Sequence, residues 1–233
     1  MTELRGTPYA FLLWTWCVLA CCALFLLLPV APDCVAGTEQ GAAASIYPKA
    51  GSYKLQRIQE VPSGWVLKES KWLPRRLSTY TTGKVTLFSF FYGVCRDPLG
   101  CPAAWAAFQA VHDAVKSDPE LHNKVRLVFL SLDPEADTPE ALSFYNTSMS
   151  TPEAPWAFLT TWSEGFLANI LERMYVPAAR ERDPDGKPTD IITHLLKVFL
   201  IDKNGWVREV YTTSFLNPDV ILSDIKTLLL EEN

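Results

Sequence analysis

The sequence lacks most of the patterns that would assign it to a large functional class. Its 21 Lys and Arg against 26 Asp and Glu give a formal net charge of −5, so no excess of basic side chains is available to attract nucleic acid. It has no phosphate-binding glycine loop, no Gly-x-Ser-x-Gly turn and no paired-histidine zinc motif. No segment of about 20 to 50 residues recurs, which excludes solenoids and propellers. Nucleotide-binding, hydrolase and nucleic-acid functions therefore find no support.

Charge is also absent from one long segment near the N-terminus. Residues 9–30 (YAFLLWTWCVLACCALFLLLPV) are about long enough to cross a hydrocarbon core of roughly 30 Å as a helix. The apolar part of a cleaved signal peptide is usually only about 7 to 15 residues long. Residues 1–34 are therefore predicted to be an uncleaved membrane anchor, with a cleaved signal segment as the alternative. Both interpretations export the rest of the chain.

The location follows from what precedes the apolar segment. No Arg-rich and Ser-rich transit region comes before residue 9, which favours a bacterial inner membrane with the domain in the periplasm. A mitochondrial inner membrane, with the domain facing the intermembrane space, is the alternative. Residues 35–54 begin with small and polar side chains, which predicts a flexible linker. Residues 55–233 are enough for one domain.

The order of elements within this domain predicts an α/β fold. A buried strand, a helix beginning near Cys101-Pro102, a second buried strand and a second helix imply a right-handed parallel βαβ unit. A hairpin around Asn204-Gly205 and a last helix complete the element order of the thioredoxin-like fold, a central mixed sheet flanked by helices. The predicted strands are 84–92, 125–132, 156–160, 196–201 and 207–211, and the predicted later helices are 139–145, 164–174 and 218–230.

Two further segments have less certain periodicity. Residues 65–77 (WVLKESKWLPRRL) mix aromatic and basic side chains, and we interpret them as an edge element that packs its tryptophans on the domain. Residues 178–190 (AARERDPDGKPTD) are polar, and we interpret them as an exposed loop.

Only two of the six cysteines fall in the predicted domain, Cys95 and Cys101. Cys101 is expected where a helix begins, facing unpaired backbone N–H groups and the positive end of the helix dipole, which stabilises a thiolate. Cys95 leaves the preceding strand, and a loop containing Gly100 can return its sulfur close to that of Cys101. Two thiolates suit Cu(I), zinc or redox cycling with each other, whereas a structural disulfide remains the alternative.

The three histidines differ in position. His112 and His122 fall in or just after the first predicted helix, where we expect them to face solvent. His194 lies where a strand is about to enter the core, and it is the candidate third ligand beside Cys95 and Cys101. Position alone leaves a purely structural role open.

The motifs FSFFYGVCRDPLGCP, LSLDPEADTPEAL and ITHLLKVFLIDKNG, in this order, resemble the SCO/SenC family of copper-binding proteins of cytochrome oxidase assembly. The resemblance covers roughly residue 54 to the C-terminus. It implies a thioredoxin-like domain that binds copper, as Cu(I) or Cu(II), through Cys95, Cys101 and His194. It also implies delivery to the binuclear copper centre of a terminal oxidase, or to another cuproprotein, with a thioredoxin-like protein as reductant.

The chain departs from the family at one place. Five residues separate its cysteines, where the family usually has three, and the longer loop could alter copper affinity or favour a disulfide. Two functions therefore stay open: a copper chaperone, which we prefer to an enzyme, and a thiol-disulfide oxidoreductase that reduces the cysteines of a cuproprotein partner. His194 separates them, because a three-ligand copper site requires it and dithiol exchange does not.

Overall fold

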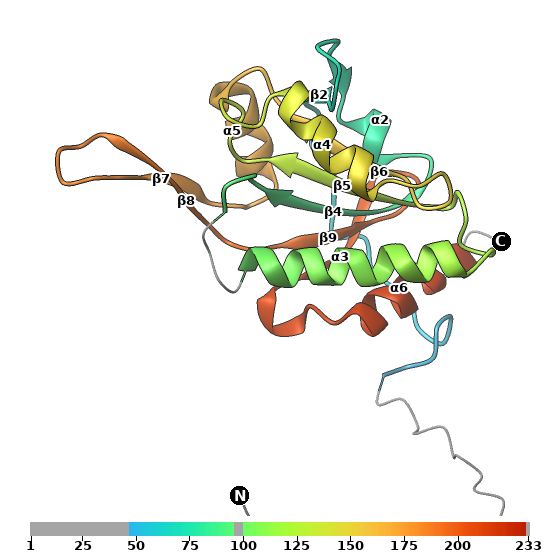
Figure 1. Ribbon diagram of the computed structural model, residues 1–233. Helices are drawn as coiled ribbons and strands as arrows, with labels where there is room; N and C mark the ends of the chain where they lie inside the picture. Colours follow the sequence, from blue (N-terminus) through green and yellow to red (C-terminus); the bar gives the residue numbers. More distant parts are fainter. Residues whose placement is uncertain (1–46, 96–99, 232–233) are drawn as a thin grey trace, which may run out of the picture. The chain divides into compact units, whose positions relative to one another are not determined.

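The computed structural model describes residues 47–95 and 100–231 (Figure 1). The predicted membrane anchor, residues 1–34, and the linker as far as residue 46 lie outside the described residues. Among the helices of the described ranges, none has the length and apolar character needed to cross a bilayer.

An eight-stranded mixed sheet lies at the centre of the domain, in the strand order β1-β10-β9-β4-β5-β6-β2-β3. Strands β4, β5 and β6 are mutually parallel, and β9 pairs antiparallel with β4. All seven residues of β4 are buried, as expected of a strand covered on both faces. The strands are β1 Gln59–Glu60, β2 Trp65–Lys68, β3 Arg75–Arg76, β4 Val85–Phe91, β5 Val125–Ser131, β6 Trp156–Thr160, β9 Val198–Ile201 and β10 Trp206–Tyr211.

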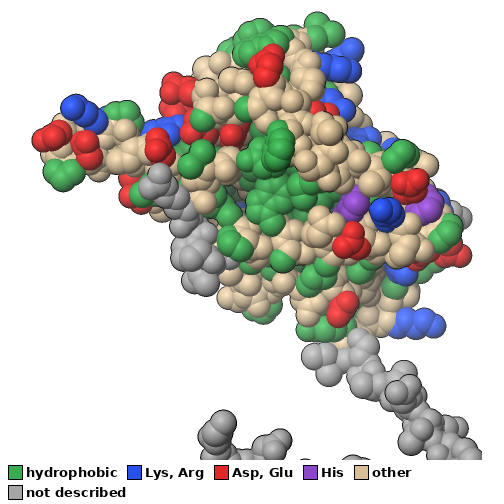
Figure 2. All heavy atoms as spheres, viewed as in Figure 1, with side chains coloured by type: hydrophobic (Ala, Val, Ile, Leu, Met, Phe, Trp, Pro, Cys, Tyr) green, Lys and Arg blue, Asp and Glu red, His purple; other side chains and the backbone are tan. Residues whose placement is uncertain are grey.

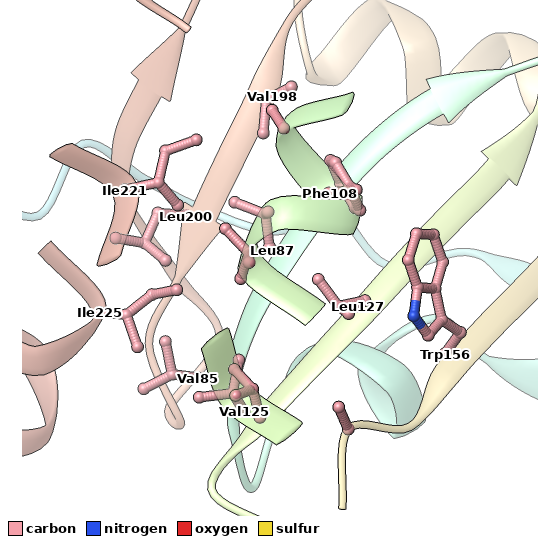
Figure 3. Close-up of a cluster of buried hydrophobic side chains, with 14 of the residues drawn as sticks. Val85, Leu87, Phe108, Val125, Leu127, Trp156, Val198, Leu200, Ile221 and Ile225 are labelled. Carbon is pink, nitrogen blue, oxygen red and sulfur yellow. The ribbon is translucent and has the colours of Figure 1, made fainter. Parts of the chain in front are cut away.

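Helices cover both faces of this sheet and bury two apolar clusters. One cluster joins the sheet to helices α3, α4 and α6, and Figure 3 shows part of it, with Leu87 and Leu127 from the sheet, Phe108 from α3 and Ile225 from α6. The other cluster joins the opposite face to α5 and to the residues around α2. The helices are α2 Ser78–Thr81, α3 Gly100–Ser117, α4 Pro139–Met149, α5 Glu164–Arg173 and α6 Pro218–Glu231, with a short 3₁₀ turn at Thr213–Phe215.

The predicted βαβ unit and C-terminal hairpin are confirmed. Strands β4 and β5 are parallel and connected through α3, and β9 and β10 are antiparallel neighbours. Between them Gly205 has φ +87°, a left-handed conformation that glycine adopts without strain, and Asp202 accepts hydrogen bonds from the backbone N–H groups of Asn204 and Trp206.

The prediction that residues 178–190 form an exposed loop is wrong. They belong to a two-stranded antiparallel sheet of β7 (Ala178–Arg182) and β8 (Pro188–His194), in which Ala178 pairs with His194. Figure 1 shows this hairpin extending away from the body of the domain. Because most of the hairpin faces water on both sides, its side chains are polar, and a polar composition does not distinguish such a hairpin from a loop.

Residues 65–77 do form the sheet edge, as β2 and β3, but their tryptophans do not pack fully on the domain. The side chains of Trp65 and Trp72 are both exposed. The prediction was therefore right for the edge strands and wrong for the aromatic side chains.

The described chain makes contacts ahead of Leu55, inside the segment predicted as a linker. The backbone N–H of Gly51 donates to Thr227 Oγ1 at 3.0 Å, and the Tyr53 hydroxyl donates to Asp224 Oδ1 at 2.5 Å. Both acceptors lie on α6, so contacts with the folded domain begin at least as early as Gly51.

Replacing Phe108 tests how tightly the cluster beneath α3 is packed. Its ring is fully buried and stacks on Phe129 with centroids 4.2 Å apart. We expect Phe108→Ala to lower the free energy of unfolding by about 3 to 5 kcal/mol, because it removes buried apolar surface and leaves a cavity. Phe144→Ala, at a ring that is 72% exposed on α4, is the control and should stay within about 0.5 kcal/mol of the wild type in chemical denaturation. Equal losses for the two variants would contradict this packing.

Candidate metal centre

Cys95 and Cys101 meet at the carboxyl end of β4, where α3 begins. Their sulfurs form a disulfide, and their Cα atoms are 6.6 Å apart. The predicted proximity of the two cysteines is therefore confirmed. Cys101 is buried and Cys95 is half-buried against the cluster that contains Tyr92. A cavity of about 210 Å³ adjoins the disulfide and is lined by Tyr92, Gly93, Cys95, Cys101, Pro102, Trp105 and Tyr145.

Cys101 is the second residue of α3, as its position before Pro102 predicts. The 18-residue helix has no acidic side chain in its first turn, so no carboxylate there competes for its N-terminal backbone N–H groups. These groups and the helix dipole favour a negative charge at this position, which stabilises a thiolate once the disulfide is reduced. Gly100 begins the helix and is buried, so it is not the loop residue that the sequence predicted.

The carboxylate of Asp137 fixes the backbone just before Cys95. The Ser131 hydroxyl donates to Asp137 Oδ2 at 2.5 Å, and the backbone N–H of Gly93 donates to both carboxylate oxygens at 3.2 and 3.0 Å. A Cβ on Gly93 would lie 2.6 Å from Asp137 Oδ1, so only glycine fits this close approach. Burial raises the pKa of Asp137 above its ordinary value of 3.8, although the hydrogen bonds from Ser131 and, to a smaller extent, Gly93 act in the opposite direction.

A second carboxylate of the same loop holds the β7–β8 hairpin. Asp133 is buried and accepts from Arg180 of β7 at 2.8 Å. Arg180 also donates to the backbone oxygen of Thr189 on β8, at 3.2 Å. A single guanidinium therefore ties both strands of the hairpin to the loop that follows β5.

His194 is the last residue of β8 and is half-buried. Its Nδ1 lies 3.1 Å from the backbone oxygen of Ile192, which places a proton on Nδ1 and leaves the lone pair of the neutral ring on Nε2. The ring meets the edge of Tyr92, with centroids 5.9 Å apart. Tyr92 is buried, and its hydroxyl accepts the N–H of Ile192 at 3.4 Å. Because Tyr92 is three residues before Cys95, it connects the histidine strand to the cysteine loop.

The disulfide-bonded form does not assemble all three predicted ligands. Within residues 47–95 and 100–231, no three His, Cys, Asp or Glu side chains are arranged to hold a metal ion. The structure joins Cys95 to Cys101 and places His194 beside Tyr92.

The prediction for the other two histidines was wrong in one case. His112, expected to face solvent, is buried on α3 against Trp156, with ring centroids 5.9 Å apart, because its helix face is covered by the sheet. His122 is half-buried, with Nε2 3.0 Å from the backbone oxygen of Lys116.

The motif LSLDPEADTPEAL contains Asp133 and Asp137, but the sequence does not show what these side chains hold. Asp133 pairs with Arg180 and Asp137 binds Gly93, both far away in the sequence. The available signal was topological, since β4 and β5 are parallel neighbours and the residues after their carboxyl ends must meet at one edge of the sheet.

The parallel βαβ unit, the antiparallel hairpin and the disulfide at a helix N-terminus define a thioredoxin-like protein with a dithiol centre. The family model SCO1/SenC matches residues 75–230, well over half of the 233 residues, and the chain belongs to this family.

Individual relatives agree with this assignment. The chain is 25% identical to the SCO1 protein homolog of Bacillus subtilis (strain 168) over 146 residues, which are 62% of this chain and 71% of the relative. The crystal structure of Arabidopsis thaliana ScoI with copper bound is similar with a TM-score of 0.61 and 18% identity, over 74% of this chain and 99% of that one. BsSco, described as a cytochrome c oxidase assembly protein with a disulfide switch, has a TM-score of 0.56 and 23% identity, over 76% and 98%.

The raised pKa of Asp137 predicts a pH-dependent contribution to stability. Because the folded state holds this proton more tightly than the unfolded state, the contribution is fully present below about pH 3.8 and is lost as pH rises through the folded pKa. Asp137→Asn cannot titrate, so the free energy of unfolding of the wild type minus that of the variant should fall as pH rises through this window. Urea titrations between pH 3.5 and 8 measure it, with exposed Asp219→Asn on α6 as control. A difference that rises with pH would contradict the burial effect.

The ion pair between Arg180 and Asp133 predicts how fast the backbone amides of the β7–β8 hairpin exchange hydrogen. Arg180→Gln leaves the buried Asp133 carboxylate without its guanidinium, so we expect backbone amides of β7 and β8 to exchange hydrogen at least tenfold faster, a cost of about 1.4 kcal/mol in local opening. Hydrogen-exchange mass spectrometry resolves these amides. Arg182→Gln is the matched control, because Arg182 bonds only to Gly186 of its own hairpin turn among the contacts described. Equal exchange in the two variants would show that Arg180 does not anchor the hairpin.

Proposed function

We propose that this chain is a copper chaperone whose ligands are Cys95, Cys101 and His194. Its cargo would be delivered to the binuclear copper site of a terminal cytochrome oxidase, or to another cuproprotein. The observation that carries the proposal is the meeting of two cysteines at the N-terminus of α3 in a member of the SCO1/SenC family. The copper bound by the Arabidopsis relative supports the choice of metal.

The chemistry of the donors fits copper. Thiolates and a neutral imidazole are the soft and intermediate ligands that Cu(I) prefers. The contact between His194 Nδ1 and the Ile192 oxygen resembles the outer hydrogen bonds that orient metal-ligating histidines, and it directs Nε2 to be the ligand atom.

Reduction of the disulfide is the first step of loading. Two electrons and two protons convert the Cys95–Cys101 bond into two thiols, and a dithiol protein of the thioredoxin type is the proposed donor. Copper binding then displaces the thiol protons, so affinity depends on pH. His194 also has to approach the sulfurs, since the described residues of the oxidised form contain no cluster of three possible ligands.

The surrounding residues limit how far each ligand has to move. Asp137 fixes Gly93 two residues before Cys95, and the Asp133–Arg180 pair fixes the hairpin that ends in His194. Both carboxylates come from the loop after β5, so the same loop contacts the cysteine segment and the hairpin that carries His194.

The disulfide itself favours a second function. In thiol-disulfide exchange the reduced Cys95–Cys101 pair would attack a disulfide of a cuproprotein, leaving the partner with two thiols and this chain with the bond seen here. The half-buried Cys95 is the more accessible sulfur for that attack, whereas Cys101 is buried. In this function His194 has no ligand role.

We also propose the cellular arrangement that the sequence favours. Residues 1–34 would anchor the chain in a bacterial inner membrane, and the domain from residue 55 would work in the periplasm. Residues 35–54 would form a flexible linker between the two. The absence of charged side chains from residues 9–30 supports the anchor.

Copper titration of the reduced chain tests the proposal. In competition with a Cu(I) chelator, we expect one tight equivalent, and we expect His194→Ala and Cys95→Ser each to weaken it at least tenfold, about 1.4 kcal/mol. His122→Ala is the matched histidine control and should bind as the wild type does. The oxidised chain should not bind tightly, because both sulfurs are in the disulfide.

The opposite result would favour the second function. Weak copper binding that His194→Ala leaves unchanged, together with rapid reduction of a partner disulfide by the reduced chain, would contradict the chaperone. Loss of tight binding in His122→Ala to the same extent as in His194→Ala would contradict the ligand assignment.

A further inference from the structure

The edge of the sheet formed by β2 and β3 carries apolar side chains that the fold does not bury. Trp65 is 41% exposed, Trp72 49%, Leu73 61% and Trp162 48%. Trp72 lies between β2 and β3 and Trp162 follows β6, and their ring centroids are 5.6 Å apart. Two segments ninety residues apart in the sequence therefore contribute to one surface. We call these four residues with the basic residues Lys71, Arg75 and Arg76 the aromatic–basic edge.

The charge of this edge is opposite to that of the chain. Residues 65–77 contain four basic side chains and one acidic one, whereas the whole chain has a net charge of −5. The one acid, Glu69, is buried and pairs with Lys68 at 2.8 Å. Lys71, Arg75 and Arg76 are exposed. Another acid, Glu140 of α4, approaches from outside the segment and accepts a hydrogen bond from Trp72 Nε1.

Aromatic and basic side chains are in direct contact here. The Arg76 guanidinium lies over the ring of Trp65, 4.2 Å from its centroid. Figure 2 shows hydrophobic side chains at the top of the view, around the β2–β3 hairpin of Figure 1, with basic side chains beside them and an acidic side chain among them.

We propose that the aromatic–basic edge docks on the surface of an anionic phospholipid membrane. Tryptophan is enriched at membrane–water interfaces, where its apolar ring and its N–H both find partners. Lysine and arginine near the surface are attracted by anionic headgroups. The edge combines both chemistries on a protein that is acidic elsewhere, so its charge complements a membrane of anionic lipids.

A second copy of the chain fits this edge less well, because it would bring the same positive charge to the same place. Strand β3 is the last strand of the sheet, where a further strand could pair, but it consists of two exposed arginines, Arg75 and Arg76, which oppose edge-to-edge addition.

The docking surface is separate from the disulfide centre. The cysteines lie at the end of β4, which is separated from β2 and β3 by β5 and β6 in the sheet. The proposal therefore does not depend on copper binding or on the membrane anchor. Docking through this edge would hold the domain in a defined orientation on the bilayer.

Vesicle binding by residues 45–233 tests the proposal without the N-terminal segment. Both apolar clusters lie within residues 45–233, which form one compact unit, so this part keeps the whole described core. We expect sedimentation with vesicles of phosphatidylcholine and phosphatidylglycerol to be at least tenfold stronger than with pure phosphatidylcholine, and to weaken with salt. Brominated lipids should quench tryptophan fluorescence in the bound state.

Paired substitutions identify the surface. Leu73→Ser with Trp162→Ser should lower binding to the anionic vesicles at least tenfold, and Lys71→Gln with Arg75→Gln should remove the preference for phosphatidylglycerol. Phe215→Ser, at an aromatic ring 74% exposed near α6, is the matched control and should bind as the wild type does. Circular dichroism verifies that each variant is folded.

Three results would overturn the proposal. These are equal binding to both kinds of vesicle, loss of binding in Phe215→Ser as large as in the paired apolar variant, and a dimer in solution that this paired variant abolishes while vesicles remain unbound. The last result would assign the edge to a second copy of the chain.

Discussion

The buried carboxylate of Asp137 is the interaction on which the arrangement of the centre depends. It accepts from Gly93 and Ser131, and it therefore joins the chain that leaves β4 to the chain that leaves β5. The two strands are parallel neighbours, so both chains leave the same edge of the sheet and need a polar contact to hold them. Burial of the carboxylate is unfavourable by itself, and the hydrogen bonds from Ser131 and Gly93 compensate for it.

The loop after β5, which contains Asp137, also contacts the β7–β8 hairpin outside the thioredoxin-like core. The β7–β8 hairpin is joined to the domain by the buried side chain of Ile192, by the Asp133–Arg180 pair and by the contact between Tyr92 and His194. An ion pair between partly buried groups fixes geometry more effectively than it adds stability. The histidine therefore ends a hairpin that is separate from the main sheet, whereas the cysteines lie at the carboxyl end of β4 within that sheet.

The sequence predicted the parts of the fold that are locally encoded. Buried strands such as β4 and β5 are recognisable as apolar runs, α3 by Pro102 and its apolar spacing, and the β9–β10 turn by Asn204-Gly205. The β7–β8 hairpin was missed because a ribbon solvated on both faces has no hydrophobic alternation to detect. The burial of His112 was missed for a related reason, since one polar residue on an otherwise apolar helix face gives no sign that the sheet covers it.

For the site, the sequence predicted which cysteines come together but not how they are held. The proline after Cys101 predicted that this cysteine begins a helix, and the short connecting loop predicted that Cys95 lies near it. Both predictions used only residues that are neighbours in the sequence. The proposed ligand role of His194 requires reduction of the disulfide, because thiolate ligation of copper needs the two sulfurs to be released from each other. The five-residue separation is compatible with an S–S bond across a Cα–Cα distance of 6.6 Å, so the chain can hold its two sulfurs as a disulfide. Copper capacity in such a protein is set by the reductant as much as by the ligands, since only the reduced form presents two sulfurs.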